Sequence, residues 1–149
     1  MKQIELQRGI AALEFLLVAP LLIMVVLAVS EMGWAFHQYQ AMTRATRDGA
    51  RYAASNALLG SIGIIYLRAS VIQQTSNLVV YGNVNGGGEP LLPGWSIGDI
   101  TVTSPDSEHV TVSARYGYIP LVGTIPAFYG GQPLNLTFEM HSTVQMRAL

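Results

Sequence analysis

Apolar residues gather first in one long run near the start of the chain. Residues 15–30, FLLVAPLLIMVVLAVS, carry no charged side chain, and extending the run back to Ile10 adds only Glu14. A helix over residues 10–30 would be about 31 Å long, which matches the hydrocarbon core of a bilayer. We therefore predict a transmembrane helix within residues 10–36.

The short segment before this run is basic. Lys2 and Arg8 outweigh Glu5, and positive charge before a first membrane span favours a cytoplasmic N-terminus. The sequence therefore predicts a single-pass topology with residues 37–149 outside. Pro20 lies within the run, and because proline removes a helical hydrogen bond we expect a local kink there.

A helical pattern continues beyond the apolar run. Mostly small or apolar side chains recur at spacings of three and four residues and share one helical face, namely Ala35, Tyr39, Met42, Thr46, Gly49 and Ala53. Arg44, Arg47 and Arg51, here called the arginine stripe, lie nearly opposite. The pattern predicts a helix over residues 37–58 that packs through its small-residue face. Asp48 is spaced to pair with Arg44 or Arg51.

The middle of the chain predicts a shorter helix and then a loop. Over residues 62–80, apolar side chains again fall roughly on one helical face, namely Ile64, Leu67, Val71 and Leu78. Residues 81–98 are rich in Gly and Asn and include Pro90 and Pro93, a composition typical of loops.

The C-terminal part alternates between apolar and polar side chains. We predict strands at residues 99–104, 109–118 and 134–146, because alternation with a period of two is typical of half-buried strands. The predicted fold is therefore α+β, with a long N-terminal helix, a second helix and a small antiparallel sheet of about three strands.

One predicted loop is unusually apolar. Residues 119–133, IPLVGTIPAFYGGQP, lie between the second and third predicted strands. A loop of this composition either covers the core or is presented to a partner or a membrane. The sequence leaves both possibilities open.

Composition narrows the possible functions. The chain is 50% hydrophobic and 11% charged, with a net charge of −1, whereas soluble proteins are roughly 25% charged. This balance excludes a disordered charged tail and gives no support for nucleic-acid binding. With no cysteine, the chain has no disulfide framework, cysteine zinc site or thiol nucleophile.

No set of residues in the sequence indicates catalysis, a metal or a cofactor. The three histidines lack the spacing of metal ligands. Asp99, Asp106 and Glu108 surround one predicted turn but fit no calcium-binding pattern, so we expect solvated turn acids. We therefore expect a protein that is not an enzyme.

The apolar run itself allows three interpretations. A signal peptide cut after Ala28-Val29-Ser30 would leave a periplasmic binding or structural domain that begins at Glu31. An uncleaved anchor would keep Met1. The third follows from Glu14, because a carboxylate costs about 2.5–3.5 kcal/mol at the centre of a membrane helix and so calls for a function and a partner. Glu31, at the outer boundary, is expected to be hydrated or to contact another subunit.

Residues Arg8–Phe15, RGIAALEF, resemble the processing site of type IV pilin-like proteins. In that class a prepilin peptidase cuts after a glycine, and the fifth residue of the mature chain is Glu. The resemblance implies cleavage between Gly9 and Ile10, with Glu14 in the fifth position and available to pair with a neighbouring subunit's new N-terminal amine. Phe15 stands where Flp-type pilins often have tyrosine, and it is a further assembly candidate.

Two later segments, EMGW at residues 31–34 and AMTRATRDGARYAA at residues 41–54, resemble the TadE-like proteins of tight-adherence pilus systems. This resemblance implies a minor pilin or pseudopilin in the bacterial inner membrane or the extracellular pilus, after loss of a leader at residues 1–9. Its implied partners are prepilin peptidase, a related pseudopilin, the major pilin, membrane lipid and the pilus assembly platform. Glu31 and the arginine stripe are candidates for these contacts.

Overall fold

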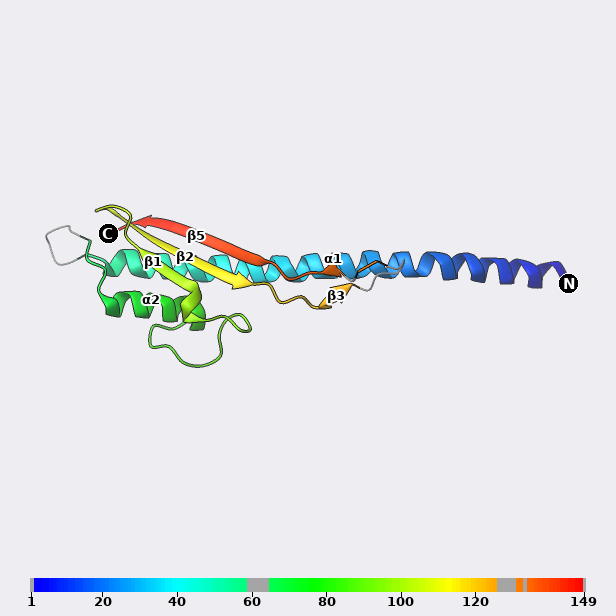
Figure 1. The fold of residues 1–149 in the computed structure, drawn as a ribbon, viewed down its shortest axis with the longest axis horizontal. Helices are drawn as coiled ribbons and strands as arrows, with labels where there is room; N and C mark the ends of the chain where they lie inside the picture. The colour runs from blue at the N-terminus through cyan, green and yellow to red at the C-terminus, as the bar shows by residue number, and fades with distance from the viewer. Residues whose placement is uncertain (1, 59–64, 126–130, 133, 149) are drawn as a thin grey trace.

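The computed structural model describes residues 2–58, 65–125, 131–132 and 134–148. One long helix, α1 (Lys2–Asn56), carries the rest of the described chain along its C-terminal half (Figure 1). The other elements are α2 (Ala69–Tyr81), the 3-10 helix η2 (Ile97–Asp99), β1 (Ile100–Thr103), β2 (His109–Gly117), β3 (Thr124–Ile125), β4 (Leu134–Asn135) and β5 (Glu139–Arg147). The predicted α+β fold is confirmed.

Helix α1 is far longer than the domain that packs on it. Its 55 residues correspond to about 80 Å, and in Figure 1 its N-terminal half projects alone. The helix continues through Pro20, so the kink expected there does not interrupt it. Proline removes one hydrogen bond from the ladder, and the apolar residues on either side keep the helical conformation.

A three-stranded antiparallel sheet in the order β1-β2-β5 faces α1. In the central register, Val112 of β2 lies opposite Val102 of β1 and Val144 of β5. Alternate residues of β2 are buried, as the period-two pattern predicts: Val110, Val112, Ala114 and Tyr116. The apolar side of the sheet therefore packs on one helical face.

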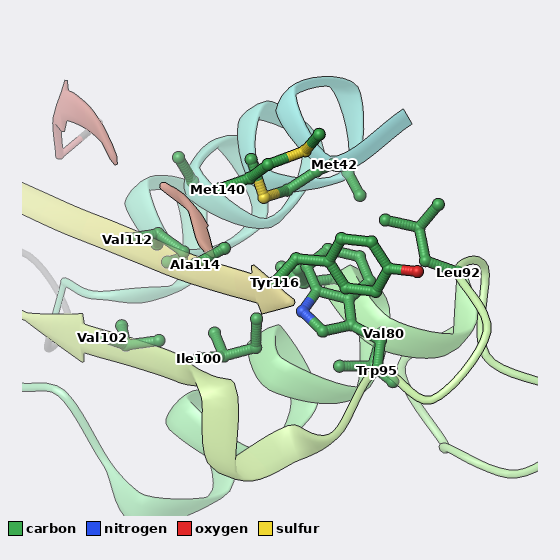
Figure 2. Close-up of a cluster of buried hydrophobic side chains, with 14 of the residues drawn as sticks. Met42, Val80, Leu92, Trp95, Ile100, Val102, Val112, Ala114, Tyr116 and Met140 are labelled. Carbon is green, nitrogen blue, oxygen red and sulfur yellow. The ribbon is translucent and has the colours of Figure 1, made fainter. Parts of the chain in front are cut away.

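The small-residue face of α1 supplies the other side of the core. Its buried residues follow helical spacing and include Gln38, Met42, Ala45, Thr46, Ala50, Ala53 and Ala54. Figure 2 shows Met42 of α1 beside Met140 of β5, with Val112 and Ala114 of β2 close by. Small side chains let the sheet approach the helix closely, which gives a compact interface with few bulky residues.

The loop between α2 and β1 closes the end of this core. Trp95 donates its Nε1–H to the Arg115 carbonyl at 2.8 Å, and the Tyr116 hydroxyl donates to the Pro93 carbonyl at 3.1 Å. The Trp95 and Tyr116 rings meet edge to face with their centroids 6.0 Å apart (Figure 2). The predicted loop at residues 81–98 is thus held against β2, and its end forms η2.

The second helix begins later than the sequence predicts. The predicted helix spanned residues 62–80, but α2 begins at Ala69, and residues 59–64 lie outside the described chain. Ile65 instead forms an antiparallel bridge with Leu58, and Tyr66 donates its backbone N–H to the Ala57 carbonyl at 2.8 Å. Ile65 and Tyr66 thus pair with the residues that follow α1, and the backbone is still extended at Arg68, directly before α2 begins.

The third predicted strand, residues 134–146, is interrupted. Leu134–Asn135 forms β4 and pairs with β3, whereas β5 begins only at Glu139. The Asn135 side chain accepts a hydrogen bond from the Thr137 N–H at 3.0 Å, a local turn that competes with strand pairing. Phe138, an apolar position within the predicted strand, is 52% exposed.

Gly49 tests how closely α1 and α2 must approach. A Cβ at this position would overlap Val79 Cγ2 and lie 3.5 Å from Thr75 Cγ2. Replacing Gly49 with alanine should lower the free energy of unfolding by about 1–3 kcal/mol through overpacking, against a helix-propensity gain of at most about 1 kcal/mol. The measurement is chemical denaturation of the full chain in detergent micelles.

Gly33 of the same helix provides the matched control. A Cβ there meets nothing within 4 Å, so Gly33→Ala should be neutral or stabilising by up to about 1 kcal/mol. Equal stabilities for the two variants would contradict the close approach at Gly49.

Candidate functional site

The N-terminal half of α1 is largely apolar, and the described residues leave most of it uncovered. Among the described residues, one helix is long and apolar enough to cross a membrane, judged by length and composition, and none of its most apolar window is buried. Leu17 is 80% exposed, and many other large side chains in this half are exposed to a similar degree. Such a surface is compatible with a single-pass membrane anchor, although a signal sequence meets the same criterion.

The predicted processing and assembly residues lie on this uncovered half. Gly9 is inside α1, and Ile10, Glu14 and Phe15 are exposed. Among the described side chains from Ile10 onward, none forms a hydrogen bond or ion pair with Glu14. An exposed carboxylate on an otherwise apolar helix is available to a group outside this chain.

Glu31 occupies a very different environment. It is only 7% exposed, and its Oε1 accepts hydrogen bonds from the Tyr118 hydroxyl at 2.7 Å and from the Leu121 N–H at 2.9 Å. The Tyr118 hydroxyl also lies 3.2 Å from the Glu31 carbonyl. The expectation that Glu31 is hydrated is wrong, because the segment after β2 covers it.

Two further side chains of α1 bind the same segment. Gln38, 1% exposed, donates to the Ile119 carbonyl at 3.0 Å and accepts from the Ile119 N–H at 3.4 Å. Trp34 donates its Nε1–H to the same carbonyl at 3.1 Å. Glu31, Trp34 and Gln38 with residues 118–121 are here called the helix–loop junction.

Sequence reasoning missed the helix–loop junction, although one signal was available. Gln38 precedes Met42 by four residues and so falls on the small-residue face, where a buried amide needs partners. The partner carries no such signal, since a backbone carbonyl has no sequence signature. Packing at the junction also extends the folded domain to Glu31, within the segment 10–36 predicted to cross the membrane.

The junction shifts the pKa of its tyrosine. Burial raises the pKa of Tyr118 well above its ordinary value of 10.0, and the hydrogen bond to Glu31 and the negative charge of that carboxylate raise it further. Burial also raises the pKa of Tyr116. Tyr118 therefore remains a protonated donor to Glu31 throughout the neutral and mildly alkaline range.

The arginine stripe is exposed, as its position opposite the small-residue face predicts. Arg44 donates to the Gln40 side chain at 2.9 Å. Asp48 forms no ion pair with Arg44 or Arg51 among the described side chains, although its spacing allows one. All three arginines are thus presented to the surroundings of the helix.

The acidic residues near the predicted turn have structural roles. Asp106 accepts hydrogen bonds from the backbone N–H groups of Glu108 and His109 and pairs with the His109 ring at 2.9 Å. The Glu108 N–H bond is the largest of the effects that lower the pKa of Asp106. Asp99 accepts from the Ser96 N–H in a capping box at η2. These carboxylates are used in local turn and helix-end geometry.

The fold and the uncovered helix together define a class: a small α+β domain built on the C-terminal half of one long, N-terminally apolar helix. Residues 9–51 match the family model described as TadE-like protein. The match covers less than a third of the chain, from Gly9 through Glu14 to Arg51 of the arginine stripe. Neither the curated proteins nor the solved structures give a significant match. The TadE-like resemblance of the N-terminal segment is confirmed.

Replacing Tyr118 with phenylalanine should remove one donor from the buried Glu31 carboxylate. Because hydrogen bonds to charged groups contribute roughly 1.5–3 kcal/mol, the free energy of unfolding of the full chain in micelles should fall by about that amount near neutral pH. Tyr66→Phe is the control, since Tyr66 is 58% exposed.

The same variant should also change how the free energy of unfolding depends on pH in the alkaline range. The pKa of Tyr118 is higher in the folded state than its unfolded value of about 10. Its contribution to the stability of the folded protein is therefore complete below about pH 10 and is lost as the pH rises above that value. Wild type should therefore lose more stability than Tyr118→Phe between about pH 9 and about pH 11. Because the pKa of Tyr116 is also raised, the variant should still lose some stability over this pH range. Identical losses in the two proteins would contradict the buried Tyr118–Glu31 contact.

Proposed function

We propose that this protein is a minor pilin or pseudopilin that takes part in assembling a Tad/Flp-type pilus at the bacterial inner membrane. The observation that carries the proposal is the division of α1: its C-terminal half builds the core of a small domain, and its apolar half is left uncovered. The match of residues 9–51 to TadE-like proteins supports the same role. The work of the protein is assembly rather than turnover.

In this proposal α1 serves two successive environments. Prepilin peptidase removes residues 1–9 on the cytoplasmic side, and the apolar half holds the subunit in the membrane with its C-terminal domain outside. On assembly the same surface leaves the lipid and packs against the corresponding helices of other subunits. An apolar helix suits both environments, because lipid chains and neighbouring apolar side chains solvate it comparably.

Glu14 gives the assembly step its register. In an apolar helix bundle an unpaired carboxylate is costly, whereas one that meets the α-ammonium of a neighbour's Ile10 is compensated. Glu14 lies four residues after Ile10, or about 6 Å along the helix. A subunit one turn out of place would leave both charges unpaired, so the pair favours one axial position.

The proposed partners follow from this sequence of events. Prepilin peptidase acts on the leader, membrane lipid and the assembly platform hold the processed subunit, and a related pseudopilin or the major pilin packs along α1. The exposed arginine stripe and Phe15 are available for these contacts. Glu31 is excluded from the free surface by its bonds to Tyr118 and Leu121, and it acts within the chain.

Processing is tested by the N-terminus and intact mass of the protein isolated from native membranes. The expected chain begins at Ile10, and replacing Gly9 with a bulky residue such as leucine should leave the leader in place. A chain beginning at Glu31 would instead establish a signal peptide, and an intact Met1 an uncleaved anchor. Either result would overturn the proposed processing.

Glu14 is tested separately. Glu14→Ala should leave cleavage and membrane insertion unchanged, because neither needs the carboxylate, and should reduce pilus output roughly tenfold or more if the pair contributes at least about 1.4 kcal/mol. The readouts are intact mass, membrane fractionation and sheared surface fibres. Thr103→Ala, at an exposed position of β1, is the control, and normal fibre output from Glu14→Ala would contradict the assembly role.

A further inference from the structure

We propose that the outer domain rests its membrane-proximal loop in the headgroup and upper acyl region of the outer leaflet. This loop comprises the described residues 119–125, 131–132 and 134–138. The proposal depends on the membrane anchor of the proposed function and adds a second lipid contact to it. Figure 1 shows β3 beside α1 at the end of the domain that faces the projecting half of the helix.

The helix–loop junction determines the depth of the loop relative to the bilayer. The charge-free part of α1 ends at Ser30, one residue before Glu31. Because the Leu121 N–H bonds to Glu31 Oε1 at 2.9 Å, Leu121 lies at the edge of the hydrocarbon region. Ala28, one turn closer to the membrane centre, lines a groove with Leu136 and Phe138 whose volume is about 560 Å³.

The side chains of the loop suit this depth. No Asp, Glu, Lys or Arg occurs between Arg115 and Glu139. Within this stretch Leu121 is 62% exposed, and Ile119, Val122 and Phe138 are exposed as well. The loop also lies near Trp34, a residue type enriched at membrane interfaces.

Several polar groups of the loop backbone are hydrogen-bonded within the protein, which suits a region poor in water. Irregular backbone is tolerated near hydrocarbon when its polar groups have partners inside the protein. The Ile119 carbonyl accepts from both Trp34 and Gln38, and the Tyr118 N–H donates to the Phe138 carbonyl at 2.8 Å. Strands β3 and β4 pair with each other. These bonds lower the cost of removing water from the loop.

Lipid is favoured as the occupant over another protein because the loop's apolar surface is continuous with that of α1. The groove between Ala28 and Phe138 also includes Met32, which is 74% exposed and lies on the helix side. An acyl chain beside α1 could extend into this groove without a break in apolar contact. The loop offers no charged group that would select a protein partner.

The absence of cysteine from the chain permits a direct test on the full-length protein. Single-cysteine variants Leu121→Cys, Thr103→Cys and Leu17→Cys would each be labelled with an environment-sensitive fluorophore. The labelled proteins would be placed in nanodiscs of phosphatidylethanolamine and phosphatidylglycerol, which leave both faces accessible. All three positions are exposed, so the labels should not disturb the core. Quenching by aqueous iodide and by shallow or deep doxyl lipids would then be compared.

The label at Leu121 should be quenched by shallow doxyl lipid, and its iodide quenching constant should be at least about threefold lower than at Thr103. Leu17 should be quenched by deep doxyl lipid. Iodide access at Leu121 equal to that at Thr103, with Leu17 still quenched by lipid, would overturn the loop contact but leave the anchor. Protection at Leu121 without doxyl quenching would indicate a protein cover and also overturn it. Absence of lipid quenching at Leu17 would overturn the anchor and the loop contact together.

Discussion

One continuous helix must satisfy two different surroundings, and the rest of the structure follows from that constraint. Over its C-terminal half, α1 buries a face of small residues that lets the sheet and α2 approach closely. Over its N-terminal half it is largely apolar, and the described residues cover little of it. Burying apolar surface is favourable for both halves, but the described part of the domain covers only the C-terminal one. The apolar surface of the remaining half is compatible with a single-pass membrane anchor.

The boundary between the two halves is fixed by polar contacts. Glu31, Trp34 and Gln38 project from neighbouring turns of α1 and bind the backbone or hydroxyl groups of residues 118–121. A buried carboxylate is costly unless it is hydrogen-bonded, and Glu31 has two partners at Oε1 but none at Oε2 among the described groups. The junction therefore favours one placement of the sheet along the helix, and the close approach of Val79 to Gly49 favours one placement of α2. Apolar packing supplies most of the stability, and these specific contacts define the register.

Much of the fold could be predicted from periodicity because it depends on local, repeating patterns. The small-residue face of α1 and the alternation along β2 each leave a regular signature in the sequence, and burial follows both except at Tyr39 of α1, which is 45% exposed. The start of α2 and the break between β4 and β5 could not be predicted so well. They depend on single backbone hydrogen bonds, such as Tyr66 N–H to Ala57, and on the turn at Asn135. For the same reason the sequence drew attention to Glu31 but gave no sign of its partners: Tyr118 and Leu121 lie 87 and 90 residues away.

The helix–loop junction also has a mechanical consequence. Its hydrogen bonds reach sideways from α1 to the loop, so a pull along the helix axis shears them together instead of opening them one at a time. Strands β2 and β5 run alongside the same helix (Figure 1), and their packing is sheared in the same direction. Tension applied to the N-terminal half is thus shared among several contacts. The packed sheet and loop should resist being pulled off the helix along its axis far better than being peeled away from the side.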